Sequence, residues 1–119
     1  MKDFRQLKVW EKSHLLALAI NKATKEFPKE ELYRLTSQIR RASISISTNI
    51  AEGYGRNTDK EFARFLQIAM GSASETEHQL ILARDLEFLS KDSYEKLHND
   101  VEEVKRMPAS LLKTLRADC

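Results

Sequence analysis

The chain has little glycine, proline or cysteine, and these absences exclude several classes of protein. Its 119 residues include three Gly, two Pro and one Cys. So few turn-forming residues argue against a turn-rich β protein. The lone thiol, Cys119, cannot form an internal disulfide, which indicates a reducing compartment. No apolar run approaches the ~20 residues that a transmembrane helix needs, and the first residues are too polar for a signal peptide. We therefore expect a cytoplasmic protein that does not contact a membrane.

Neither sign of charge is in large excess, but basic and acidic residues are unevenly distributed along the chain. The formal net charge is +2. Residues 1–71 contain 13 Lys and Arg against 8 Asp and Glu, whereas residues 72–119 contain 7 against 10. A basic first half is a weak indication of a polyanionic partner. Attraction between opposite halves of two copies explains the asymmetry equally well.

Apolar residues recur at intervals of three and four along the whole chain, which is the spacing of amphipathic helices. The pattern predicts helices over residues 8–27, 30–52, 58–86 and 91–115. Short connections make sequential helices antiparallel neighbours. We expect one all-α domain over residues 1–119, an up-down-up-down four-helix bundle. For the second helix the predicted core positions are Leu32, Leu35, Ile39, Ala42, Ile46 and Ile50.

Local signals set the expected helix ends. Pro28 should end the first helix, and Gly53 should close the second in a left-handed conformation. Thr58 and Glu61 form a capping box for the third helix. Pro108 lies at a core position of the fourth helix, before Leu111, and should kink or interrupt it.

A strand competes with the second helix over residues 43–47. Ser43-Ile44-Ser45-Ile46-Ser47 alternates with period two, as a half-buried strand would. The helical spacing continues on both sides of these serines, and the sequence offers no partner strand. The segment is therefore predicted to be helical.

The first helix is more apolar than one buried stripe requires. Leu15 and Leu18 extend its apolar surface beyond the stripe, and such a helix needs cover on a second side. We expect these two leucines to lie at an interface between copies of the chain.

Residues able to support catalysis or bind a metal are few. Two Glu-x-x-His pairs, Glu11…His14 and Glu75…His78, resemble half-sites of a di-iron bundle. In an up-down-up-down bundle their histidines lie about 9 and 30 Å from the same end, at ~1.5 Å per residue, so they cannot share a metal. His98 is interpreted as part of a solvated face. We expect no catalytic residues, no metal and no cofactor.

Basic residues form the best candidate binding surface. Two groups lie away from the predicted core and are the candidate nucleic-acid-binding residues: Arg34, Arg40 and Arg41, then Arg56, Lys60 and Arg64. In a symmetric ring each group would repeat, and repeated weak contacts bind a polyanion well.

Several motifs occur together in a recognisable order: Phe4-x-x-Leu7-x-Val9-Trp10, Leu35-x-x-Gln38-Ile39-Arg40-Arg41-Ala42, Ser45-Ile46-x-x-Asn49-Ile50-Ala51-Glu52-Gly53-x-Gly55-Arg56, Lys60-Glu61-Phe62-x-x-Phe65-Leu66 and Gly71-Ser72-x-x-Glu75. Nearly the whole chain thereby resembles the four-helix-bundle proteins encoded in intervening sequences of bacterial 23S rRNA genes. The resemblance implies a homopentameric ring and distant kinship to the accessory variability determinant of diversity-generating retroelements, which binds a reverse transcriptase and nucleic acid. It implies no enzymatic activity and no cofactor.

Within this resemblance, one block is interpreted as a structural turn motif: Asn49, Glu52, Gly53, Gly55 and Arg56. We expect Glu52 and Arg56 to form an ion pair and Asn49 to bond to loop backbone. The sequence departs from the family pattern at Ser47, Thr76 and Pro108. Ser47 replaces a usual proline and so puts a bend in the second helix in doubt.

Three hypotheses of function follow. The leading one is a non-enzymatic homo-oligomeric ring that binds RNA, or a nucleic-acid enzyme such as a reverse transcriptase, through basic residues. The second is a protein-protein adaptor without nucleic-acid binding. A metal-dependent bundle enzyme is a distant third.

Overall fold

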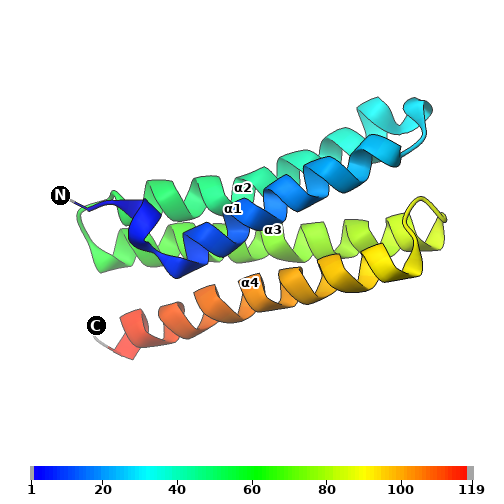
Figure 1. The fold of residues 1–119 in the computed structure, drawn as a ribbon. Helices are drawn as coiled ribbons and strands as arrows, with labels where there is room; N and C mark the ends of the chain where they lie inside the picture. Colours follow the sequence, from blue (N-terminus) through cyan, green and yellow to red (C-terminus); the bar gives the residue numbers. More distant parts are fainter. Residues whose placement is uncertain (1, 118–119) are drawn as a thin grey trace.

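The computed structural model of the protein describes residues 2–117, with side chains described as far as residue 115. It contains four α-helices: α1 (Lys8–Ala23), α2 (Ser37–Tyr54), α3 (Asp59–Asp85) and α4 (Lys91–Ala117). They form an antiparallel up-down-up-down bundle, a rod of 46 × 21 × 20 Å, with no strand among the described residues (Figure 1). The predicted all-α four-helix bundle is confirmed.

The core lies along the axis of this rod, where each helix contributes a stripe of apolar side chains. Each helix contacts two others, so that α1 packs on α2 and α4, and α3 packs on the same two. Small side chains at Ala69 and Ala73, both fully buried, bring α3 close to its neighbours. The largest fully buried side chains are Leu16, Ile20, Ile39, Ile46, Ile50, Leu66 and Leu80.

One predicted core position of the second helix is wrong. Leu32 is 45% exposed, because the chain is not α-helical at that point and the seam begins only at Leu35. In α4 the buried residue after Pro108 is Leu112, with Leu111 only partly buried, because the stripe continues at intervals of four from Val104.

The connection between α1 and α2 is longer than predicted. After Ala23 the chain forms a 3₁₀ turn (Thr24–Glu26), an extended segment at Phe27 and Pro28, and a second 3₁₀ turn (Lys29–Glu31). A π-helical turn (Leu32–Thr36) then leads into α2, and Arg34 within it has non-helical backbone angles (φ −120°, ψ −108°). The helical prediction for residues 24–36 is therefore wrong in detail. Phe27 explains the path, because its buried ring packs against Phe88 with 5.7 Å between centroids.

Gly53 does not close α2. The helix continues to Tyr54, Gly55 is the capping residue with φ −79°, and no described glycine has a positive φ. Gly53 instead lies inside the helix where α3 crosses closely: a Cβ at this position would lie 2.5 Å from the Cβ of Phe65. Glycine is required here because α3 lies too close for a side chain, and not because the backbone adopts a left-handed conformation.

Other local predictions agree with the structure in part. Thr58 caps α3 by accepting a hydrogen bond from the Glu61 backbone N–H at 3.1 Å, but the Glu61 carboxylate pairs with Arg64, so only this half of the predicted capping box forms among the described contacts. Ser90 caps α4 in the same way with Ser93. Residues 43–47 are helical, and the buried hydroxyls of Ser43 and Ser47 donate to backbone carbonyls of their own helix. The bend that the family pattern expects at position 47 does not interrupt α2, which is one helix over Ser37–Tyr54.

Pro108 does not interrupt α4. The helix spans Lys91–Ala117, with Pro108 buried inside it. The ring occupies the core position that an apolar helix former would fill, so burial of the ring offsets part of the lost backbone hydrogen bond.

None of the helices in the described part of the chain is long and apolar enough to cross a membrane. Cys119, the lone thiol, lies outside the described residues.

Candidate nucleic-acid interface

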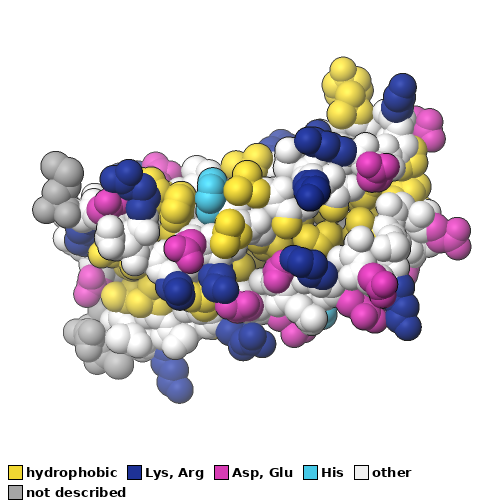
Figure 2. Space-filling view, in the orientation of Figure 1, with side chains coloured by type: hydrophobic (Ala, Val, Ile, Leu, Met, Phe, Trp, Pro, Cys, Tyr) yellow, Lys and Arg dark blue, Asp and Glu magenta, His cyan; other side chains and the backbone are white. Residues whose placement is uncertain are grey.

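The six predicted basic residues fall into two separate groups. Arg34, Arg40 and Arg41 lie at and near the start of α2, and Arg56, Lys60 and Arg64 lie around the α2–α3 turn. Arg41 and Arg56 are separated by about 20 Å along the helix axis, at ~1.5 Å per residue. Figure 2 shows basic side chains spread over one face of the rod, with hydrophobic and acidic side chains between them. One chain therefore presents two basic groups and no single patch.

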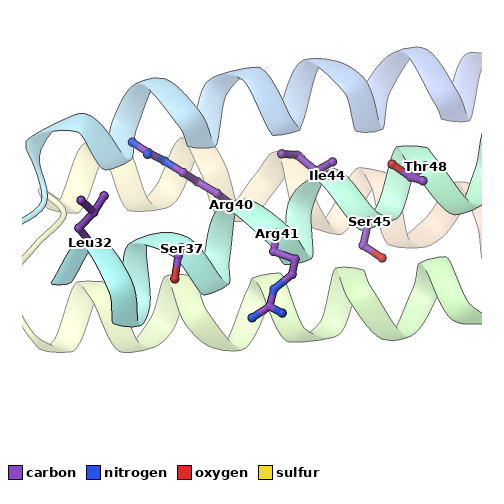
Figure 3. A pocket seen from close by; sticks show the side chains of 7 residues that line it. All are labelled: Leu32, Ser37, Arg40, Arg41, Ile44, Ser45 and Thr48. Atoms are coloured by element: carbon purple, nitrogen blue, oxygen red, sulfur yellow. The ribbon is translucent and has the colours of Figure 1, made fainter.

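Arg40 and Arg41 of the first group, but not Arg34, line a shallow groove of about 560 Å³ on the outer face of α2 and the turn before it. Figure 3 shows the lining side chains, with Arg40 extending toward α1 and Arg41 extending the opposite way. Leu32 and Ile44 supply apolar surface, at 45% and 52% exposure. The remaining lining residues are Ser37, Ser45 and Thr48.

A second hollow of about 430 Å³ adjoins this groove and shares Leu32 and Arg40 with it. Lys25 and Lys29 from the α1–α2 connection line it. None of the residues that line the two hollows is acidic. We call Lys25, Lys29, Arg40 and Arg41 the basic strip.

Sequence reasoning missed the two lysines of the basic strip. They lie in a segment predicted as helix end and turn, and only the fold places them beside α2. Their proximity to Pro28, which forces the chain to reverse, is the one sequence signal that could have indicated it.

The basic residues of this group differ in how their charges are engaged. Arg34 pairs with Glu31 at 3.7 Å, and Arg40 Nε donates to the hydroxyl of Thr24 at 2.8 Å. Arg41 is exposed and has no ion-pair or hydrogen-bond partner among the described side chains. Arg41 is thus the cation of this groove that is available to a ligand.

The second group surrounds the α2–α3 turn and is largely paired. The guanidinium carbons of Arg56 and Arg64 lie 4.9 and 4.6 Å from the centroid of the Phe65 ring. Arg56 also pairs with Glu52 at 3.2 Å, and Arg64 with Glu61 at 3.1 Å. These contacts hold both arginines in place, whereas Lys60 is exposed and has no ion pair or hydrogen bond among the described side chains.

Asn49 acts differently from the prediction. Its Nδ2 donates to the backbone carbonyl and the hydroxyl of Ser45, at 2.8 and 2.9 Å, and not to loop backbone. The Ser45 hydroxyl also shares a hydrogen bond with Ser72 on α3 at 2.9 Å. The predicted Glu52–Arg56 ion pair is present. Within the motif, Gly53 packs against Phe65 of α3 and Arg56 lies over the same ring, whereas the Glu52–Arg56 pair, the Asn49 bonds and the Gly55 cap lie within α2 and its end.

Leu15 and Leu18 lie on the solvent side of α1, at 52% and 54% exposure. The buried residues of the helix, Val9, Leu16 and Ile20 among them, occupy its other face. Figure 2 shows hydrophobic side chains exposed over α1 on this face of the molecule. Within a single chain, nothing described covers the two leucines.

His98 is not on a solvated face, contrary to the sequence interpretation. Its Nε2 lies 3.2 Å from a carboxylate oxygen of Glu77 on α3 and 3.7 Å from one of Glu102 on α4. Its ring stacks on Tyr94 with 5.4 Å between centroids. Of the histidines in the predicted Glu-x-x-His pairs, His14 stacks on Trp10 and His78 is exposed, on different helices.

Comparisons with known proteins agree with the resemblance that the motifs indicated. The sequence model of the family described as 23S rRNA-intervening sequence protein matches residues 5–110. A similar solved structure is that of a protein with unknown function from the S23 ribosomal protein family of Bacteroides thetaiotaomicron. It is 30% identical with a TM-score of 0.80, and the similarity covers 88% of this chain and 98% of that chain. No curated protein matches the chain.

Proposed function

The chain belongs to the family of 23S rRNA-intervening sequence proteins, and on that premise we propose that it is a non-enzymatic scaffold whose copies form a ring that binds RNA. The ring in this proposal has five copies, packed through the exposed leucines of α1. The RNA contacts lie along the basic strip. A nucleic-acid enzyme bound in place of RNA is the nearest alternative.

The observation that carries the RNA proposal is the unpaired Arg41 beside an apolar groove that no carboxylate lines. Sites for single-stranded nucleic acid combine a positive groove that follows the phosphates with aromatic side chains on which the bases stack. Arg40 and Arg41 supply the positive charge here, and Lys25 and Lys29 extend it toward the α1–α2 connection, whereas Leu32 and Ile44 offer aliphatic surface that can contact bases without stacking.

One copy of the basic strip is too small to bind RNA tightly, because it offers only a few cations to the phosphates. Repetition changes the affinity: once one site on a ring is occupied, the next binds at a high effective concentration. The exposed Leu15 and Leu18 support such an assembly, because an interface that covers them removes apolar surface from water.

RNA binding is tested by fluorescence anisotropy of a labelled single-stranded RNA over a series of salt concentrations. Binding should weaken as salt rises, with a logarithmic slope of about −0.7 for each phosphate contact. Arg41→Glu should weaken binding and reduce the slope, because it removes the free cation of the groove. Lys8→Glu, an exposed position on α1, makes the same charge change and should have a much smaller effect. Equal losses in the two variants would mean that only net charge matters.

The ring is tested by light scattering during gel filtration. Wild type should elute with about five times the 13.8 kDa mass of the chain. A Leu15→Glu, Leu18→Glu double variant should dissociate, because it places charge in an apolar interface, whereas Asn21→Glu adds charge at a polar position of α1 and should not. A wild-type monomer would refute the assembly.

The same measurements distinguish the adaptor hypothesis from the RNA-binding hypothesis. A ring that carries no RNA after purification at low salt, and shows no salt-sensitive RNA binding, would reject RNA binding and favour a protein partner.

A further inference from the structure

The contact between α3 and α4 contains a group of side chains that neither the fold nor the RNA proposal uses. Glu77 comes from α3, and His98 and Glu102 come from α4 one helical turn apart. Each offers one ligand atom, and the three atoms all lie within 4.8 Å of one another. We propose that these three residues form a binding site for a divalent transition-metal ion, with zinc as the ion that suits the donor set.

The distances agree with such a site. Zinc binds imidazole nitrogen and carboxylate oxygen at ~2.0–2.2 Å, and tetrahedral geometry then places neighbouring ligand atoms ~3.3 Å apart. His98 Nε2 already lies 3.2 Å from Glu77 and 3.7 Å from Glu102. The Glu77 and Glu102 oxygens are at most 4.8 Å apart, so the two carboxylates must approach by up to about 1.5 Å to close the triangle around an ion.

Neighbouring groups hold the ligands in this arrangement. The His98 ring stacks on Tyr94, whose other partner is the Arg84 guanidinium at 4.7 Å from the ring centroid. Lys105 Nζ donates to Glu77 Oε1 at 3.0 Å, which leaves Oε2 directed at His98. A hydrogen bond to a ligating carboxylate and packing of the ligand ring both restrict the orientation of the ligands, while the positive charge of Lys105 opposes a bound cation. The hydrogen bond from Lys105 also holds the pKa of Glu77 below its ordinary value.

The site is open to solvent on one side. The side chains of Glu77 and His98 are 22% and 26% exposed, and that of Glu102 is 48% exposed. An ion can therefore enter without unfolding, and three protein ligands leave a fourth position for water or for a group from a partner.

A plain ion-pair network is the competing explanation, and the two differ in the state of the imidazole. An ion pair requires protonated His98, whereas a metal requires the neutral ring and binds in competition with the proton. Because the ligands come from two helices, a bound ion also links α4 to α3 and stabilises the folded chain.

The test is calorimetric titration of zinc chloride into the full-length chain carrying Cys119→Ser, so that the terminal thiol does not bind zinc. We expect one zinc per chain and a rise in melting temperature with zinc. His98→Ala should weaken binding by more than the ~10–100-fold that loss of an outer partner costs. The matched control is His78→Ala, which removes an exposed histidine of α3 and should bind zinc as tightly as the parent.

If His98→Ala does not fold, as judged by circular dichroism, His98→Gln replaces it, because glutamine keeps much of the size and polarity of histidine. The absorption spectrum of bound cobalt gives a second readout, since four-coordinate nitrogen and oxygen ligation is expected in the parent and not in the His98 variants. No zinc binding by the parent, or equal binding by the parent and the His98 variants, would overturn the proposal.

Discussion

The close approach of α2 and α3 at Gly53 yields a prediction with a definite sign. Gly53→Ala places a methyl group 2.5 Å from the Cβ of Phe65. The Phe65 Cβ is fixed to the backbone of α3, so no side-chain rotation relieves the contact. The two helices must separate locally by about 1 Å to reach ordinary van der Waals distance.

Two effects of opposite sign determine how much Gly53→Ala changes the free energy of unfolding. Replacing glycine by alanine inside a helix stabilises it by about 1 kcal/mol. Forcing an extra methyl into a packed core costs about 1–3 kcal/mol, and here the displaced neighbours include Phe62 and Phe65, both 6% exposed. Because whole helices must move, we expect the upper part of that range and a net destabilisation of about 1–2 kcal/mol.

The other two glycines are internal controls. A Cβ at Gly71 in α3 would meet nothing within 4 Å, so Gly71→Ala should stabilise the chain by about 0.5–1 kcal/mol. A Cβ at Gly55 would lie 3.6 Å from the nearest atom, the Glu52 carbonyl oxygen, so Gly55→Ala should be nearly neutral. Urea unfolding followed by circular dichroism, with all variants at one protein concentration, measures the three changes. A Gly53→Ala variant as stable as Gly71→Ala would refute the reasoning.

Three further outcomes follow from the described contacts. Asn49→Ala and Ser72→Ala should each cost about 1 kcal/mol in urea unfolding, and the double variant less than their sum, because both bond to the Ser45 hydroxyl. Glu52→Gln should change the free energy of unfolding by less than ~0.5 kcal/mol, since its ion pair with Arg56 is exposed; a larger loss would give that pair a structural role. Leu66→Ala should cost about 2–5 kcal/mol at a fully buried site, and a loss below 1 kcal/mol would contradict the core as described.

The fold could be predicted from the sequence because its helices are long and regular. A seam such as Ile39, Ile46 and Ile50 repeats the same spacing over several turns, so one irregular position does not obscure it. The alternation at residues 43–47 resembles a strand only locally. The hydroxyls of Ser43 and Ser47 donate to carbonyls of their own helix, so these serines can be buried in a helix as readily as alanine.

The errors fall where a residue's role depends on a distant segment. Gly53 fits two explanations, a left-handed cap or a close crossing, and only the position of Phe65 decides between them. The predicted end of α1 is wrong because the position of Phe27 is set by its contact with Phe88, which is sixty-one positions away in the sequence. For the same reason His98 looked solvated beside its charged neighbours, since its partner Glu77 belongs to another helix.

The order in which the helices pair has a consequence for how fast the chain folds. Three of the four packed pairs, α1–α2, α2–α3 and α3–α4, join helices that follow one another in the sequence, and only α1–α4 joins the two ends. Such local pairing closes short loops, which cost little entropy, and helical bundles of this kind fold in microseconds to milliseconds. We expect the hairpin of α2 and α3, with its short turn and the Ser45–Ser72 bond, to form first, which φ-values of Gly71→Ala and Ser72→Ala would check. Subunits should thus be folded long before they meet, so that assembly, and not folding, sets the pace at which any ring appears.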